Sequence, residues 1–251
     1  LNVMLVYAAG EQFLGSIDTS GEVKDANYQF ARLVEHIDKV GKEKVVQVCT
    51  DNAAVMRNTG VLLCAKYPHI YFQGCAAHCL DLLLEDWAKE SWVKKLIKKG
   101  KSVVNFFRNH QMPDAIYRRY EKRYSLLNPG ETRFATNFLM LERLLKVKVG
   151  LEQTIIDPDW DRYVRTLRDE RKRPTLSKSR KTRVIIRSDD FWAKCVNYVH
   201  MVEPVLVALR EFDGKKPMMG KAWLVMKNLA HHVRNLKKDP FNLPDDLYHY
   251  M

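Results

Sequence analysis

The apolar residues of this chain change their spacing near residue 76, and this change limits the folds that the sequence can adopt. Before it, short runs rich in β-branched residues alternate with stretches whose apolar residues recur every three or four positions. The short runs predict strands at 2–9, 13–18, 45–49 and 70–72. The stretches predict helices at 19–41 and 53–66. From His78 onward the spacing is helical. The sequence therefore predicts an α/β fold at the start, followed by a large all-α region.

We divide the chain into domains 1–88 and 89–251. In the second domain, Pro204 lies inside the apolar pattern of 191–209 and predicts a kink or a break there. The segment 168–183 (RDERKRPTLSKSRKTR) has one apolar residue, many lysines and arginines, and no periodicity. We predict that this segment is a mobile basic loop within the helical domain.

Positive charge is concentrated in the middle of the chain. Residues 1–90 carry a formal net charge of −4, residues 91–190 carry +13 and residues 191–251 carry +3. Clustered positive charge is typical of proteins that bind nucleic acid. A solvated, lysine-rich helical surface has the same composition, so composition alone leaves both interpretations open.

The five cysteines are an odd number in a chain without a secretory leader, which indicates reduced thiols of an intracellular protein. No apolar run approaches the roughly 20 residues that span a bilayer, so we expect no membrane partner. The chain begins with leucine, and its first residues already predict a strand. We therefore expect a fragment of a longer protein.

An acidic residue follows the strand predicted at 45–49. In KVVQVCTDNAAVMRNTG (44–60), the apolar run ends in Thr50, Asp51 and Asn52, before a helical stretch. Asp and Asn are preferred at helix N-termini, so Asp51 could simply start the helix. Alternatively, Asp51 lies at the C-terminal end of a central strand, which is where α/β sheets bind their ligands. Local spacing does not separate these two interpretations.

Four segments of the chain carry a resemblance to a known family. They are TDNA (50–53), CAAHCLDLLLED (75–86), TRFAT (132–136) and the stretch FWAKC…KKPMMG (191–220). In this order, they resemble the plant hAT-like transposases and their domesticated relatives, over most of the chain. The resemblance implies an RNase H-like core with a mixed sheet, which a large all-α insertion domain interrupts. The sheet would lack its first strand in this chain. The resemblance therefore implies that the chain is an internal fragment.

The resemblance also implies a role for Asp51, as the second catalytic acid of such a core. In the family, three carboxylates hold two divalent ions, normally Mg²⁺, that activate the attacking oxygen and neutralise the leaving oxygen. This chain has no match for the first aspartate or for the third acid, a glutamate. We expect Asp51 to be a catalytic remnant, and a Mg²⁺ ligand only if acids outside this chain complete the site. The chain itself is expected to hold no cofactor and to cut no DNA.

Cys75, His78 and Cys79 have a spacing that could suit zinc, but four ligands are needed and no partner pair occurs elsewhere. A buried thiol pair at a strand-to-helix junction is the preferred interpretation. By the resemblance, Cys75 and His78 match a motif that lies beside the active site. This implies that His78 positions DNA or supports the carboxylates.

The candidate DNA-binding residues lie in the helical domain. Arg118 and Arg119 stand among tyrosines, where arginine can bind phosphate and tyrosine can stack on a base; core packing of these tyrosines is an equal alternative. Arg133 matches the family motif TRFAT, although its role could be structural, as a buried ion pair or a helix-terminus contact. The segment 168–183 contributes Lys178, Arg180, Lys181 and Arg183. Its basic run also resembles a nuclear localisation signal, so we expect the nucleus.

Three functions remain open at this point. The first is a transposon-derived hAT-like protein that binds DNA through its basic helical domain without catalysis. The second is an internal piece of an active transposase that uses two metal ions. The third is a protein-interaction scaffold. We expect DNA as the partner, no small-molecule substrate, and a homodimer only through regions outside this chain.

Overall fold

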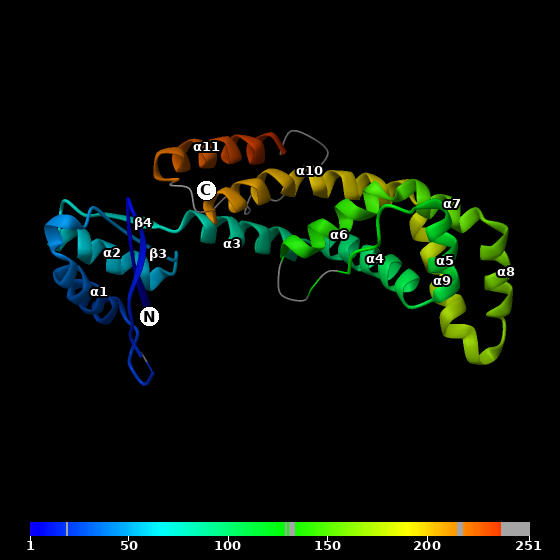
Figure 1. Ribbon diagram of the computed structural model, residues 1–251, viewed down its shortest axis with the longest axis horizontal. Coiled ribbons are helices and arrows are strands. Elements are labelled where there is room, and N and C mark those ends of the chain that lie inside the picture. The colour runs from blue at the N-terminus through cyan, green and yellow to red at the C-terminus, as the bar shows by residue number, and fades with distance from the viewer. Residues whose placement is uncertain (19, 129, 131–133, 215–217, 237–251) are drawn as a thin grey trace. The chain divides into compact units, whose positions relative to one another are not determined.

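The computed structural model describes residues 1–18, 20–128, 130, 134–214 and 218–236 of the 251-residue chain. Two compact units are present, and the first spans Leu1–Cys79 while the second begins at Leu80 (Figure 1). This division lies earlier in the chain than the one expected after residue 88. The fold is an α/β arrangement in the first unit and helical in the second.

The first unit contains two pairs of strands and two long helices. Strands β1 (Asn2–Tyr7) and β2 (Gly10–Ser16) form an antiparallel hairpin, and strands β3 (Gln47–Thr50) and β4 (Tyr71–Gly74) pair in parallel. The helices are α1 (Ala26–Val40) and α2 (Ala54–Lys66), with the single 3-10 turn η1 (Lys42–Lys44) before β3. The predicted strands and helices are therefore confirmed.

The resemblance implied one RNase H-like mixed sheet, and the structure describes two strand pairs. Among the described residues they form two separate two-stranded sheets. The hairpin strands hydrogen-bond to each other, and Met4, Val6 and Phe13 are exposed. Strand pairing depends on long-range contacts, which the local spacing of apolar residues does not specify.

The core of the first unit lies between α1, α2 and the β3–β4 pair. Asp25 caps α1 by accepting the N–H of Tyr28, and Gly41 ends it with a φ of 96°, which favours glycine. The buried residues of this core are Ile37, Leu63, Tyr67 and Ile70. Helix α2 approaches β4 closely at Gly60, where any side chain would overlap the ring of Phe72.

The second unit is helical throughout its described part. Its helices are α3 (Ala76–Lys89), α4 (Ser91–Arg108), α5 (Gln111–Tyr120), α6 (Phe134–Lys146), α7 (Lys148–Ile156), α8 (Pro158–Thr166), α9 (Arg173–Ile186), α10 (Asp189–Phe212) and α11 (Met219–Leu236). One continuous apolar core joins them, with Trp87, Phe107, Trp160 and Phe191 among its fully buried side chains. Helix α10 continues through Pro204 without a break.

The prediction of a loop over 168–183 was wrong. The 3-10 turn η2 (Glu170–Lys172) leads into α9, in which Pro174 occupies the first turn. The positions of α9 that face the core in this segment are Ser179 and Thr182, both buried, with Ile185 and Ile186 following. Small hydroxyl side chains occupy positions where a helix normally has apolar ones, so the segment lacks a hydrophobic period.

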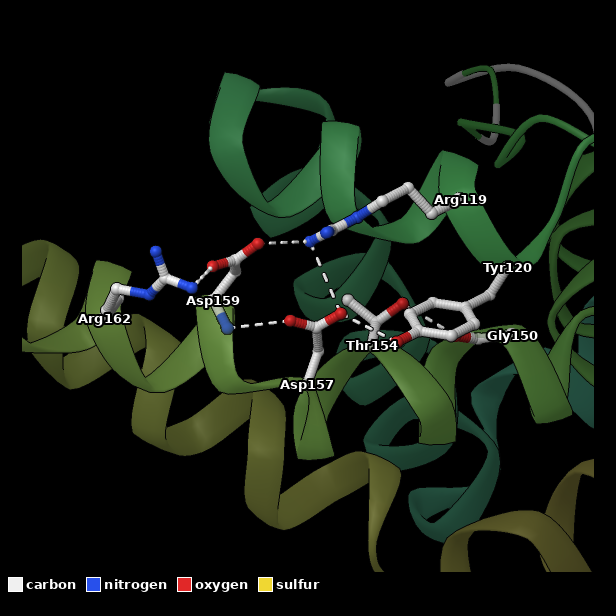
Figure 2. Close-up of polar contacts among 7 residues, drawn as sticks. All are labelled: Arg119, Tyr120, Gly150, Thr154, Asp157, Asp159 and Arg162. Carbon is white, nitrogen blue, oxygen red and sulfur yellow. Dashed lines mark hydrogen bonds and ion pairs between the residues drawn. The ribbon is translucent and has the colours of Figure 1, made fainter.

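A buried carboxylate joins α5, α7 and α8 (Figure 2). Asp157, the N-cap of α8, accepts hydrogen bonds from the hydroxyl of Tyr120 at 2.7 Å and from the N–H of Asp159 at 2.7 Å. The guanidinium of Arg119 lies 3.3 Å from Asp157 and 2.9 Å from Asp159. The hydrogen bond from Tyr120 holds the pKa of Asp157 below its ordinary value, with the N–H of Asp159 and Arg119 adding to it.

We expect the substitution Asp157→Ala to lower the free energy of unfolding by about 1–3 kcal/mol at neutral pH, because it removes a helix cap and leaves the Tyr120 hydroxyl without its acceptor. The folded-state pKa is lowered, so this stabilisation is present above the ordinary carboxyl pKa and is lost as the pH falls through the folded value. Urea unfolding at several pH values measures both effects.

The matched control is Asp161→Ala, on the same helix, whose side chain is about half exposed and pairs with Arg183. A surface ion pair contributes about 0–1 kcal/mol, so the control should cost less than Asp157→Ala. Equal losses in the two variants, or a loss at Asp157 that does not shrink in acid, would contradict the role assigned to this carboxylate.

Candidate nucleic-acid interface

The carboxyl ends of β3 and β4 lie together because the two strands run in parallel. Thr50 pairs with Gly74, and the N–H of Cys75 donates to the carbonyl of Thr50 at 2.7 Å. Asp51 therefore follows the end of β3, beside the start of α3. Its side chain is exposed, and its Oδ1 accepts the N–H of Ala53 at 3.1 Å, in the turn that leads into α2.

Asn52, which the sequence did not single out, links the two strand ends. Its Nδ2 donates to the carbonyl of Cys75 at 3.0 Å and to Sγ of Cys79 at 2.9 Å. Burial raises the pKa of the Cys49 and Cys79 thiols, and the neighbouring Cys75 raises both further. All three cysteines are free thiols. The strand ends are thus joined by the Asn52 amide, with three thiols close to it.

His78 lies in the first turn of α3 and is half-buried, three residues after Cys75. Cys75, between β4 and α3, and His78, on α3, therefore lie at the same end of the β3–β4 pair as Asp51. The residues at these strand ends do not fit two Mg²⁺ ions, because thiols and an amide accompany a single carboxylate, whereas Mg²⁺ prefers carboxylates and water. In the described ranges, no three His, Cys, Asp or Glu side chains are grouped as metal ligands.

A different arrangement appears on the helical unit, where a groove runs between α4 and α9. It consists of two adjoining hollows of about 440 Å³ and about 330 Å³, and Lys181 lines both. We call it the lysine groove, and its lysines are Lys95, Lys98, Lys99, Lys178, Lys181 and Lys194. From Lys95 to Asn109, α4 provides about 20 Å of this surface, because a helix rises about 1.5 Å per residue.

The lysine groove keeps most of its positive charge. Lys194, on α10, forms an ion pair with Asp190 at 2.7 Å, and the pKa of Asp190 is lowered by Lys194 and by Lys99. The other five lysines of the groove form no ion pair with another described residue. The groove therefore carries five lysines without a direct ion pair among the described residues: Lys95, Lys98, Lys178 and Lys181 are exposed, and Lys99 is half-buried near Asp190.

Neutral polar groups complete the smaller hollow. Ser102, Asn105 and Asn109 line it, together with His110. The ring of His110 stacks on Phe106 with centroids 4.6 Å apart, and its Nδ1 lies 2.7 Å from the Phe106 carbonyl. Since a carbonyl can only accept, Nδ1 carries the hydrogen in this contact. These groups can donate hydrogen bonds to phosphate oxygens but show no arrangement for reading bases.

The helical conformation of α9 separates the basic residues that the sequence grouped in one loop. Lys178 and Lys181, three residues apart, lie on the groove side. Arg180 is exposed and does not line either hollow. Arg183 pairs with Asp161 of α8 at 2.9 Å.

The remaining predicted DNA contacts lie elsewhere. Arg118 pairs with Asp114 at 2.7 Å within α5, and Arg119 is held by Asp157 and Asp159 (Figure 2). Tyr117 is buried in the core, and Tyr120, although exposed, donates its hydroxyl hydrogen to Asp157. Arg133 lies outside the described residues.

Lys95, Lys98 and Lys99 of the groove were not predicted from the sequence. The signal was present, since these positions recur with Ser102, at spacings of three and four along one helix, and so occupy one face. The opposite side of the groove, with Lys178 and Lys181 on α9, could not be recognised as a helix face because 168–183 was predicted to be a loop.

In the part of the chain that the structure describes, no helix has the combination of length and apolar character needed to cross a membrane. Residues 1–103 match a family model described as "Domain of unknown function (DUF659)". The match covers the first unit, α3 and most of α4, including three lysines of the groove. No curated protein matches the chain.

Proposed function

We propose that this chain is part of a transposon-derived, hAT-like nuclear protein that binds duplex DNA through the lysine groove. The observation that carries the proposal is the group of five lysines without an ion pair to another described residue, four of them exposed, on two helices that lie side by side. Each phosphate that such a lysine neutralises releases counterions, which is the main source of affinity in binding that does not depend on sequence. Lysine acts on phosphate as a point charge, so we expect little preference for base sequence.

The family part of the proposal rests on two supports that share residues 50–53 and 75–86. One is the resemblance of four segments to hAT-like transposases, and the other is the match of residues 1–103 to the DUF659 family, a domain that occurs in transposase-related proteins. An RNase H-like core completed outside this chain is part of the same proposal. The β3–β4 pair followed by α3, with Asp51 after β3, is compatible with it.

We further propose that this chain does not itself cleave DNA. Asp51 accepts a backbone N–H in its own turn, and its neighbours at the strand ends are thiols and an amide. One carboxylate in this setting is a weak ligand set for two Mg²⁺ ions. The carboxylate remains available as a ligand should further acids come from outside the chain.

We expect binding of a fluorescent DNA duplex to fall steeply with salt and to be independent of Mg²⁺. With about five lysine–phosphate contacts, the logarithmic slope should be about −4 to −5, so affinity falls roughly 250-fold to 1000-fold between about 50 and 200 mM salt. Fluorescence anisotropy gives this slope, and a gel of the same samples with Mg²⁺ or EDTA should show intact DNA.

A binding curve that salt leaves unchanged would contradict the phosphate contacts. No binding at low salt would favour the protein-interaction scaffold instead. Cleavage that requires Mg²⁺ and is lost in Asp51→Asn would contradict the non-catalytic part of the proposal.

A further inference from the structure

Helix α11 presents a second basic surface, which has a different composition from the lysine groove. Trp223 is 70% exposed, whereas Trp87, Trp160 and Trp192 are buried. Lys227, His231 and Arg234 follow Trp223 at intervals of four, four and three residues, so they lie on the same face of the helix, and all are exposed. We call these four residues the α11 stripe.

The opposite face of α11 is anchored in the core of the helical unit. Leu229, Val233 and Leu236 are buried there, and His232 contacts the Met201 carbonyl of α10 at 3.3 Å. Figure 1 shows α11 lying along α10. The exposure of Trp223 is therefore not caused by a lack of packing: the helix has a fixed inner face and presents the indole outward.

The chemistry around Trp223 points to an anionic, flat ligand. Nζ of Lys227 lies 4.8 Å from the centroid of the Trp223 ring. Helix α11 contains no Asp or Glu, so its exposed face is positive along its length. An indole can stack on a nucleic-acid base while neighbouring cations bind the phosphates on either side of it.

We propose that the α11 stripe binds single-stranded nucleic acid, with one unpaired base stacked on Trp223 and its phosphates on Lys227 and Arg234. In a duplex the faces of the bases are covered by their neighbours, so an exposed indole has nothing to stack on. This inference goes beyond duplex binding in the lysine groove and does not depend on it.

A membrane surface is the alternative ligand for a basic helix with an exposed tryptophan. Helices that lie in a membrane bury a broad apolar face in the lipid. The apolar face of α11 is already buried against the protein, and its exposed large apolar side chains are Trp223 and Leu224 alone among the described positions of this helix. Single-stranded nucleic acid therefore fits the stripe better.

The test uses the full chain and a short oligothymidylate. We expect the oligonucleotide to quench tryptophan fluorescence, and we expect the quenching to be reduced in Trp223→Phe. In Trp223→Ala, affinity measured by anisotropy should fall at least about fivefold, which is the lower bound for the loss of one stacked base. The matched control, Leu224→Ala, removes an exposed apolar side chain one residue away and should leave affinity unchanged.

Several outcomes would overturn the inference. The first is that Trp223→Ala and the wild type bind oligothymidylate with equal affinity. The second is that a duplex of the same length quenches Trp223 fluorescence as much as the oligonucleotide does. The third is that phosphatidylserine vesicles quench the fluorescence and the oligonucleotide does not. Charge reversal of Lys178 and Lys181 should leave the Trp223-dependent quenching in place. That last comparison separates failure of the stripe from failure of the groove.

Discussion

Replacing Lys178 and Lys181 by glutamate is expected to weaken binding of duplex DNA by at least about 100-fold at about 50 mM salt. The double variant removes two ammonium groups from the wall that α9 contributes to the lysine groove, and places two carboxylates opposite the lysines of α4. Two lost contacts should also make the logarithmic salt slope shallower by about 2. Anisotropy titrations at several salt concentrations measure both quantities.

The control is Arg171→Glu with Arg180→Glu, which changes the net charge by the same amount. Both arginines are exposed, near or on the same helix, and neither lines the groove. We expect this variant to lose clearly less affinity than the groove variant, because neither side chain lines the hollows where the phosphates would be held. If the control loses as much affinity as the groove variant, the attraction comes from the general positive charge of the unit and the groove assignment fails.

The order and type of the elements in the first unit could be predicted because each is encoded locally. The run that becomes β3 is short, apolar and bounded by polar residues, and Asp51 follows it directly, as the sequence indicated. Parallel pairing with β4 then brings Cys75 to the same edge. The way the strand pairs are arranged was not predictable, because it depends on contacts between residues far apart in the chain.

The lysine groove was only half predictable. Lys178 and Lys181 were chosen for their charge, in a segment assigned as a loop because hydrophobic periodicity was the criterion. Helix α9 buries Ser179 and Thr182 instead of apolar side chains, and Ser179 donates to the Leu176 carbonyl at 2.8 Å. A criterion based on apolar spacing cannot detect a helix whose buried positions are hydroxyl groups.

Arg118 and Arg119 show the opposite limit of the sequence analysis. Their clustering with tyrosines is the pattern expected of a nucleic-acid site, yet Arg119 is engaged with Asp157 and Asp159, which lie about forty residues further along the chain. Cationic residues can be identified in a sequence, but the carboxylates that pair with them after folding cannot, because they lie far away in the chain. Five of the six lysines of the groove differ because they form no ion pair with another described residue, whereas Lys194 pairs with Asp190.

Replacing Trp160 by alanine is expected to lower the free energy of unfolding of the helical unit by about 3–5 kcal/mol. The side chain of Trp160 is fully buried, and its ring centroid lies 5.7 Å from that of Phe106 and 6.0 Å from that of Phe107. The substitution removes these ring contacts and leaves a cavity between α4 and α8. All five tryptophans belong to the second unit, so urea unfolding followed by tryptophan fluorescence reports on this unit.

The same chemical change at Trp223, which is 70% exposed, should alter stability by no more than about 0.5 kcal/mol, so the pair isolates the effect of burial. The Trp160 variant also tests how the core supports the surface, because Phe106 both contacts Trp160 and stacks with His110 in the smaller hollow. If the groove depends on this packing, DNA affinity should fall even where the variant is fully folded. A loss of less than about 1 kcal/mol would show that Trp160 does not hold α8 to α4.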